Sequence, residues 1–284
     1  MNHPAELKVF AFLQQALAGE TTMTEEVADK VASDVKAALF KQFDSGPRDE
    51  FRLRMSNIGR PKCQLWFDKN DSEDKTPFPP HFLMNMLIGD ITEAVFKGVL
   101  RAAGVEFQDS DYVTLELPNG KKIKGEYDMV LDDKVDDIKS ASPWSYNNKF
   151  EDFDTLNNHD SFGYVAQLVG YATAADKGVG GWWVVNKGNG EFKYVDASNV
   201  DAEAKLKDIE ALTEYLDNDM PFERCYAPEP ETYRKKPSGN LKLNTECGFC
   251  SYKHKCWPTL QTMESKVSAA KVKPMVDYVL LVEG

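Results

Sequence analysis

Two groups of residues have the types and the spacing that could do chemistry. The first contains Cys247, Cys250 and Cys256, which follow one another within ten residues near the end of the chain. Thiolates at such spacing bind zinc or iron–sulfur clusters, which usually take four ligands, so a fourth must come from elsewhere. The remaining cysteines are Cys63 and Cys225. Because an odd number of cysteines with one tight group is typical of metal binding rather than of a disulfide framework, we expect a metal site.

The second group lies in GEYDMVLDDKVDDIK, residues 125–139. If Asp132 and Asp133 form a two-residue hairpin loop, the register places Asp128 directly opposite Asp137. Like charges that face each other across a strand pair are destabilising unless a cation lies between them, and magnesium is such an oxygen-seeking cation. The alternative is an exposed acidic turn, since DDKVDD contains four aspartates.

A lysine and a glutamate extend this second group. The period of two along a strand puts Lys139 on the same face as Asp137. Residues 81–104 have helical periodicity, and Glu93 lies on the apolar face of that helix, where an unpaired carboxylate is costly. An ion pair with Lys97, one turn later, is the alternative explanation for this glutamate.

The elements that must position these residues indicate an α/β fold. Residues 4–18 and 24–43 have helical periodicity and are expected to form an appendage over residues 1–45. After the helix at 81–104 we expect strands at 112–118, 122–131 and 135–139 as a three-stranded meander, a helix at 161–176, strands at 181–186 and 191–196, and a helix over about 201–217. Residues 140–160 are expected to form a polar loop, long enough to be functional.

The combined pattern resembles the PD-(D/E)XK nuclease superfamily. The resemblance is carried by Asp128 in GEYD, the D-x-K element Asp137-Ile138-Lys139, Glu93 in IGDITE, and Gln167 and Tyr171 in QLVGY. It implies a restriction-endonuclease-like core built from a helix, a three-stranded meander, a helix and a strand. Within the superfamily, the chain resembles RecB-type nucleases with an iron–sulfur cluster, which include AddB, CRISPR-associated adaptation nucleases and phage exonucleases.

In that branch one cysteine precedes the nuclease core and three follow it. Cys63, in SNIGRPKCQLWF, is therefore expected to join Cys247, Cys250 and Cys256 as the fourth ligand. The resemblance, which covers about residues 50–260, favours a 4Fe-4S cluster, with zinc as the lesser alternative. Cys225 lies outside the matched spacing and is expected not to be a ligand. The implied nuclease domain spans residues 46–284, with a core over about 76–223 and a cysteine-stapled cluster subdomain over about 46–75 plus 224–284.

The resemblance also implies a role for each residue of the site. Glu93, Asp128, Asp137 and the backbone carbonyl of Ile138 would hold one or two Mg2+ or Mn2+ ions. Lys139 would orient the attacking water and neutralise the phosphate. Gln167 and Tyr171 share a helix face and would line the site, although helix packing is the alternative for both. Many RecB-type members carry histidine where this chain has Glu93, which leaves the metal preference open.

DNA contacts are expected outside the carboxylate group as well. Trp144, Tyr146 and Lys149 could stack on bases and contact a phosphate, with an ordinary loop packed on the core as the alternative. The chain carries a net charge of -12, but residues 48–62 carry +3 and residues 224–256 carry +4. Within the second basic stretch, Arg234, Lys235, Lys236, Lys253 and Lys255 are expected to face DNA. Two solvated loops are the alternative explanation for the basic stretches.

Composition sets the wider expectations. With 284 residues and 42% hydrophobic content, the chain can bury a substantial core. It has no long apolar run and no basic, cleavable start, so we expect a soluble cytoplasmic protein that does not contact membranes. The expected function is a metal-dependent deoxyribonuclease, an exonuclease, in DNA replication, recombination or repair, with a recombinase, a helicase or a single-strand-binding protein as candidate protein partners. The alternative is a noncatalytic DNA-binding or scaffold protein with a structural four-cysteine metal site.

Overall fold

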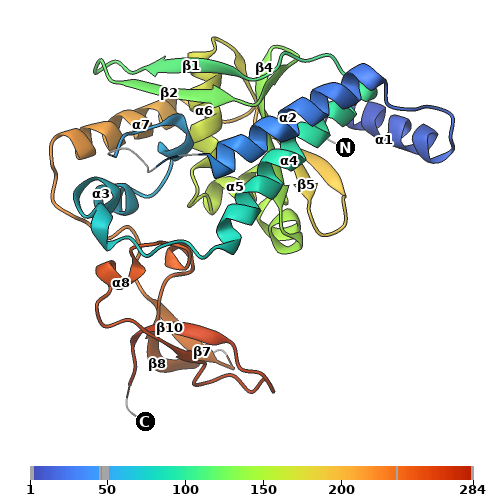
Figure 1. Ribbon diagram of the computed structural model, residues 1–284. Coiled ribbons are helices and arrows are strands. Elements are labelled where there is room, and N and C mark those ends of the chain that lie inside the picture. Colours follow the sequence, from blue (N-terminus) through green and yellow to red (C-terminus); the bar gives the residue numbers. More distant parts are fainter. Residues whose placement is uncertain (1–2, 45, 47–50, 235, 283–284) are drawn as a thin grey trace. The chain divides into compact units, whose positions relative to one another are not determined.

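The computed structural model describes residues 3–44, 46, 51–234 and 236–282. The chain divides into two compact units (Figure 1). Unit 1 comprises Met1–Gly59 and Pro79–Thr213, and unit 2 comprises Arg60–Phe78 and Glu214–Gly284. The predicted core over about 76–223 overlaps unit 1 for most of its length, but the predicted boundaries at 76 and 223 differ from the observed ones.

A four-stranded sheet lies at the centre of unit 1. Its strand order is β3-β4-β5-β6, with β3 at Met129–Leu131, β4 at Lys134–Ala141, β5 at Gly178–Asn186 and β6 at Phe192–Asp196. Strands β4 and β5 are parallel, whereas the other two pairs are antiparallel. A parallel pair needs a crossover connection, which contains α5 (Phe153–Asn158) and α6 (Tyr164–Ala174). Helix α7 (Ala202–Asp217) follows the sheet, so the unit has a mixed α/β architecture.

The expected three-stranded meander is not one continuous sheet. The predicted strand 122–131 is interrupted at Asp128, so β2 (Lys122–Tyr127) pairs with β1 (Asp111–Glu116) in a separate two-stranded sheet. The side chain of Asp128 accepts the backbone N–H of Ile138 at 2.8 Å. Because this N–H is engaged by a carboxylate, it is not available to continue the β3–β4 ladder past Asp128.

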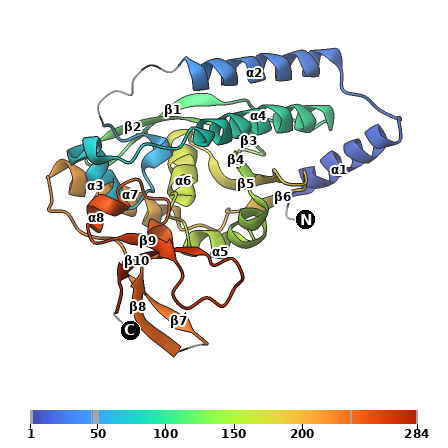
Figure 2. The same ribbon diagram turned by 60° about the horizontal axis from the view of Figure 1, so that its bottom comes forward.

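Side chains of the sheet alternate between two apolar clusters. Val135 and Trp182 point into a cluster that contains Leu168 of α6. Trp183, the residue that follows Trp182, points the other way and packs with Phe96. The alternation follows from the period of two along a strand, and it places helices on both faces of the sheet, as Figure 2 also shows.

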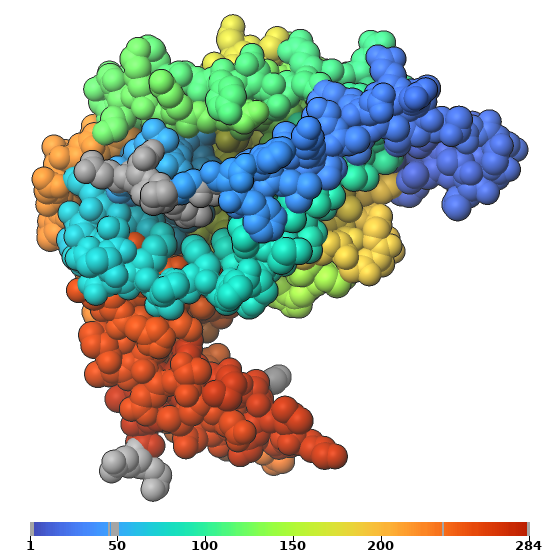
Figure 3. Space-filling view, in the orientation of Figure 1, coloured from blue at the N-terminus to red at the C-terminus, as the bar shows by residue number. Residues whose placement is uncertain are grey.

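The N-terminal helices are integral to unit 1, which contradicts the expected appendage. Helix α1 (Pro4–Leu17) buries Val9 in the cluster of Phe96, which belongs to α4 (His81–Ala102). Helix α2 (Glu25–Phe43) runs along α4, and in Figure 3 its side chains lie against those of α4. The approach is close at Gly98, where an added Cβ would lie 2.3 Å from Val31 Cγ2. Helical periodicity alone does not tell whether such helices cover a sheet or extend from it.

Unit 2 combines helices with a sheet that was not predicted from the sequence, and the short helix α8 spans Lys253–Cys256. Helix α3 spans Lys62–Asn70, and the sheet has the order β7-β8-β10-β9. Its strands are β7 (Glu229–Tyr233), β8 (Lys236–Lys242), β9 (Gln261–Glu264) and β10 (Met275–Leu280). Residues 51–59 were predicted to be part of the cluster subdomain. They belong to unit 1 instead, because Met55 and Ile58 are buried in its core.

Within the described part of the chain, no helix combines the length and the apolar character that crossing a membrane requires.

Candidate active site and cysteine centre

The β3–β4 hairpin brings Asp128 and Asp137 together. Asp132 and Asp133 have φ values of 49° and 61°, as a two-residue type I′ loop requires at both central positions. Leu131 therefore pairs with Lys134, as predicted. By the same count Asp128 reaches the level of Asp137, and its hydrogen bond to the N–H of Ile138 holds its carboxylate there.

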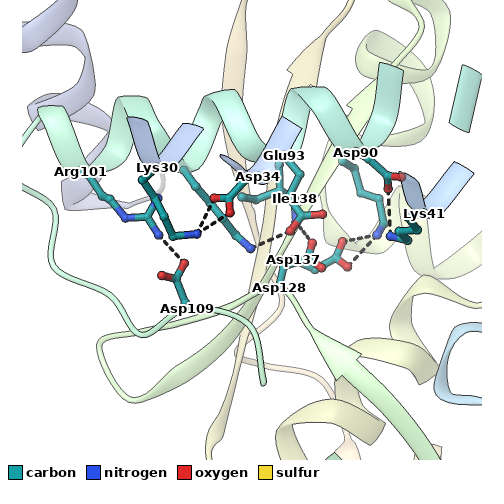
Figure 4. Close-up of polar contacts among 12 residues, drawn as sticks. Lys30, Asp34, Lys41, Asp90, Glu93, Arg101, Asp109, Asp128, Asp137 and Ile138 are labelled. Atoms are coloured by element: carbon teal, nitrogen blue, oxygen red, sulfur yellow. Dashed lines mark hydrogen bonds and ion pairs between the residues drawn. The ribbon is translucent and has the colours of Figure 1, made fainter. Parts of the chain in front are cut away.

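Helix α4 supplies the third carboxylate. Figure 4 shows Glu93 pointing from α4 toward Asp128 and Asp137. Lys97 Nζ lies 2.6 Å from Glu93 Oε1, so the ion pair considered as an alternative is present. This lysine is only 5% exposed, and its burial was not predicted from the sequence. Since its ammonium lies among the carboxylates, Lys97 is a further member of the site rather than a reason to exclude Glu93.

Lys139 forms an ion pair with Asp137. Its Nζ donates a hydrogen bond to Asp137 Oδ1 at 2.6 Å and also lies 2.6 Å from Oδ2, as an ion-pair contact. Burial favours the neutral amine, but the charges of Asp137 and Asp128 outweigh it and raise the pKa of Lys139. The side chain therefore carries a fixed positive charge beside the carboxylates.

Burial raises the pKa of each carboxylate, because it makes the charged form costly. Burial, then the charge of Asp137, raises the pKa of Asp128 to about 6. Burial, then Asp128, raises the pKa of Glu93, although Lys97 opposes this. Burial also raises the pKa of Asp137, against the influence of Lys139. Three carboxylates with raised pKa values need more positive charge than two lysines supply.

The carboxylates of this group offer oxygen donors of the kind that divalent cations bind. Asp137 is 4% exposed, and among the described residues no hydrogen bond of suitable geometry reaches its buried Oδ2. Lys139 Nζ lies 2.6 Å from this oxygen, as an ion-pair contact, and Lys97 pairs with Glu93, so three carboxylates share two ammonium groups. A divalent cation would supply further positive charge. Carboxylates plus a backbone carbonyl are the donors that Mg2+ and Mn2+ prefer. Glu93, Asp128 and Asp137 therefore supply oxygens of the right kind, but among the described residues the three ligand atoms that lie within 4.8 Å of one another belong to Asp71, Glu73 and Asp74.

Asp128 makes the stability of the metal-free protein depend on pH. Its pKa is about 6 when folded and 3.8 ordinarily, so the folded chain binds more protons between these values. The stability is therefore present at low pH and lost as the pH rises through about 6. Relative to the wild type, Asp128→Asn should gain up to about 3 kcal/mol of unfolding free energy between pH 4 and pH 7.

Urea unfolding of both proteins in a chelator at several pH values measures this difference. Addition of Mg2+ at a hundred times its dissociation constant should stabilise the wild type by ~2.7 kcal/mol at pH 7, and the variant by less. A difference that does not change with pH would contradict the assigned burial of Asp128.

Gln167 and Tyr171 reach the same place from α6. They are one turn apart on the helix, and Gln167 Nε2 donates to the hydroxyl of Tyr171 at 3.5 Å. Burial, together with the charges of Asp137 and Asp128, raises the pKa of Tyr171 to about 12, although the hydrogen bond with Gln167 lowers it. Tyr171 is 5% exposed and belongs to the apolar core as well, so packing and proximity to the carboxylates are both present.

Asp136 is a buried carboxylate that was given no role from the sequence. It is 1% exposed and accepts hydrogen bonds from Gly181 N, Trp183 Nε1 and the Tyr194 hydroxyl at 2.9, 3.0 and 2.8 Å. Burial raises its pKa to about 7, although these three donors lower it. A register shift between β4 and β5 lies beside it, which lets the Gly181 N–H reach the carboxylate. The paired glycines in GVGGWW could have indicated such a close approach.

The segment after β4 is more ordered than the polar loop that was expected. It contains a π-helical turn at Ser145–Lys149 as well as α5. Tyr146 is 8% exposed and part of the core, so its expected stacking on a base is wrong. Trp144 is 67% exposed and remains available. Lys149 lies over the rings of Phe162 and Tyr164, two aromatic residues that the sequence analysis had not singled out.

The four predicted cysteine ligands all belong to unit 2. Cys63 lies in the first turn of α3, whereas Cys247 ends the 3-10 turn Thr245–Cys247 and Cys256 ends α8. Cys250 lies between these two short elements. Burial, then the neighbouring thiols, raises the pKa of Cys247 to about 12. Burial raises the pKa of Cys250 to about 11, and Cys63 and Cys256 contribute. Neighbouring thiols therefore oppose one another's ionisation, but among the described residues no three of their sulfur atoms lie within 4.8 Å of one another.

Cys225 lies next to Cys63, and its expected role as a nonligand stays a prediction. The N–H of Cys63 donates to Cys225 Sγ at 3.1 Å. A hydrogen bond with Cys225 is the largest cause that raises the pKa of Cys63, and the same contact lowers that of Cys225. Spacing along the chain could not reveal this neighbour because residue 225 enters the centre from a different segment.

The predicted DNA-contacting residues of unit 2 lie in two places. Arg234, with φ at 50°, is in the turn between β7 and β8 and stacks on Tyr233, while Lys236 begins β8. Lys235 lies outside the described residues. Lys253 and Lys255 pair with Asp277 and Asp74, each at 2.6 Å, so part of their charge is compensated within the unit. Asp74 also belongs to an exposed acidic group with Asp71 and Glu73.

Comparisons with known proteins do not identify a family. No family model matches the chain, and no curated protein matches it. A solved structure described as "Crystal structure of SSO0001" aligns with 81% of this chain and 96% of its own chain, at 14% sequence identity and a TM-score of 0.41. A TM-score of this size does not establish a shared fold, so the mixed α/β architecture is what the coordinates themselves establish.

Proposed function

We propose that this protein is a metal-dependent deoxyribonuclease that degrades DNA from an end. The observation that carries the proposal is the group of three carboxylates, Glu93, Asp128 and Asp137, whose pKa values are all raised, first of all by burial. Lys139 Nζ lies beside them, 2.6 Å from Asp137 Oδ2. An oxygen-lined cation site next to a fixed ammonium is the combination that phosphodiester hydrolysis needs.

Each residue of the candidate active site would have a role of its own in hydrolysis. Asp128, Asp137, Glu93 and the Ile138 carbonyl would hold Mg2+ or Mn2+, which supplies a Lewis acid for water activation and for the charge that develops on the phosphate. Lys139 would contact a phosphate oxygen or the attacking water, a task suited to a compact ammonium. Lys97 would hold Glu93 in place through its 2.6 Å ion pair. Gln167 and Tyr171 would line the site from α6.

End-labelled single-stranded and double-stranded DNA test the proposal directly. Hydrolysis is expected with Mg2+ or Mn2+ and not in a chelator, and an exonuclease should release short labelled products from the first time points. Long internal fragments at early times would instead indicate an endonuclease. Absence of hydrolysis under every metal condition would favour the noncatalytic DNA-binding or scaffold alternative.

The proposal includes a metal centre in unit 2. Cys63, Cys247, Cys250 and Cys256 would bind a 4Fe-4S cluster, with zinc as the lesser alternative. Mutually raised thiol pKa values support a bound cation, because a metal offsets the repulsion between thiolates. Its role would be structural, since it would join α3 to the turns that follow β8 within the unit.

A further inference from the structure

Two aromatic rings and two lysines lie together at the start of α6. Phe162 and Tyr164 have ring centroids 5.7 Å apart with planes inclined by 9°. Lys149 Nζ lies 4.4 Å from the centroid of Phe162 and 4.9 Å from that of Tyr164. Lys139 Nζ lies 5.4 Å from the Tyr164 centroid. The ring pair, defined as Phe162 and Tyr164, is therefore next to the lysine of the candidate active site.

The backbone around the ring pair is firmly held. Gly163 separates the two rings with φ at 78°, and an added Cβ there would lie 2.3 Å from the carbonyl carbon of Gly59. Asp160 accepts the N–H groups of Tyr164 and Val165 at 2.9 and 2.8 Å. Since these contacts fix the entry to α6, the two rings are presented in a defined geometry rather than on a loose loop.

The exposure of the ring pair differs from that of the core aromatics nearby. Phe162 is 44% exposed, whereas Phe150, which packs on Tyr164, is 3% exposed. An exposed ring with parallel aromatic support and an adjacent ammonium offers both a stacking surface and a phosphate contact. Proteins that bind single-stranded nucleic acid combine these two features.

We propose that the ring pair and Lys149 bind unpaired nucleotides beside the phosphate to be cleaved, so that single-stranded DNA ends are the preferred substrate. The inference rests on the proposed nuclease function because the contact of Tyr164 with Lys139 sets its position relative to the chemistry. Bases of a duplex are already stacked and paired, and therefore cannot occupy the ring pair without being opened. Phe162 is the residue to change, since Tyr164 also contacts the catalytic candidate Lys139.

The test compares binding of two fluorescent oligomers of equal length, one of thymidylate and one abasic, in Ca2+ and in a chelator. Phe162→Ala should weaken thymidylate binding about tenfold or more and leave abasic binding unchanged, because only the former can stack. Phe162→Trp should retain thymidylate binding. Phe10→Ala is the matched control, since Phe10 is 37% exposed and stacks on Phe192 with centroids 4.6 Å apart.

Hydrolysis rates and salt dependence complete the experiment. On the proposal, Phe162→Ala lowers kcat/KM for single-stranded DNA more than for blunt duplex, and Lys149→Gln reduces the salt slope of binding by about one. Equal losses on thymidylate and abasic oligomers, or no loss on either, together with an unchanged salt slope for Lys149→Gln, would overturn the inference while wild-type hydrolysis stays intact. A wild-type protein without metal-dependent hydrolysis would instead defeat the proposed function, whatever the binding ratios.

Discussion

Asp137→Asn and Lys139→Met should each lower metal-dependent DNA hydrolysis by at least about 100-fold. Asp137 provides the buried oxygen without a hydrogen bond among the described residues, and Lys139 provides the ammonium 2.6 Å from it. Asparagine keeps the shape of the side chain but removes the charge that would attract a divalent cation. Methionine keeps much of the volume of lysine but cannot contact a phosphate oxygen. Initial rates on end-labelled DNA at saturating Mg2+ measure both effects.

Folding must be separated from chemistry in these variants. The side chains of Lys139 and Asp137 are 22% and 6% exposed, so removal of one partner leaves a poorly solvated charge and should cost up to about 3 kcal/mol. The double variant removes both charges and should recover part of this stability without recovering activity. Circular dichroism and urea unfolding report the stability, while hydrolysis is measured in the same preparations.

The loop of the hairpin and Lys177, which precedes β5, form a matched control pair. Lys177 and Asp133 also form an ion pair at 2.6 Å, but the Asp133 side chain is 79% exposed and lies in the loop between β3 and β4. Lys177→Met and Asp133→Asn should leave hydrolysis near the wild-type rate. Similar losses in both pairs would mean that hairpin stability, rather than the buried pair, controls the activity. Full activity in Asp137→Asn would remove Asp137 from the catalytic group.

Local patterns predicted the site better than they predicted its surroundings. The register of the β3–β4 hairpin follows from two adjacent residues, Asp132 and Asp133, that tolerate positive φ, and this register alone places Asp128 near Asp137. The helical position of Glu93 follows from a period of 3.6 residues over a long segment. Such relations involve neighbours in sequence or one turn of chain, so they can be counted without knowledge of the tertiary structure.

Other features depend on partners that are distant in sequence. The buried position of Asp136 requires Trp183 and Tyr194, and strand alternation alone gave no reason to expect three donors there. Tyr146 was expected in a loop, but packing against the core of unit 1 decides its burial. The break at Asp128 arises because a side chain takes the N–H of Ile138. Propensity and periodicity do not contain these long-range contacts, which is why the sequence analysis missed them.

Loss of a ligand thiol should have the largest effect on unit 2. Cys247→Ser or Cys250→Ser should lower the iron and sulfide content and the visible absorption of anaerobically purified protein to background. Structural metal binding contributes on the order of 10 kcal/mol to small domains, so unit 2 should also become sensitive to proteolysis. If zinc is the metal, the same variants should lose zinc and the wild type should show no visible absorption.

Cys63 and Cys225 form the comparison that decides the fourth ligand. The N–H of Cys63 donates to Cys225 Sγ at 3.1 Å, so both thiols stand at the same side of the centre. Cys225 accepts this hydrogen bond and, among the described residues, donates none to a ligand sulfur, so it is the competitor of Cys63 for the fourth position. With Cys63 as the proposed ligand, Cys63→Ser should lose the metal, whereas Cys225→Ser should keep it. Metal loss in Cys225→Ser with retention in Cys63→Ser would exchange their assignments, and a wild type without stoichiometric iron or zinc would exclude the centre altogether.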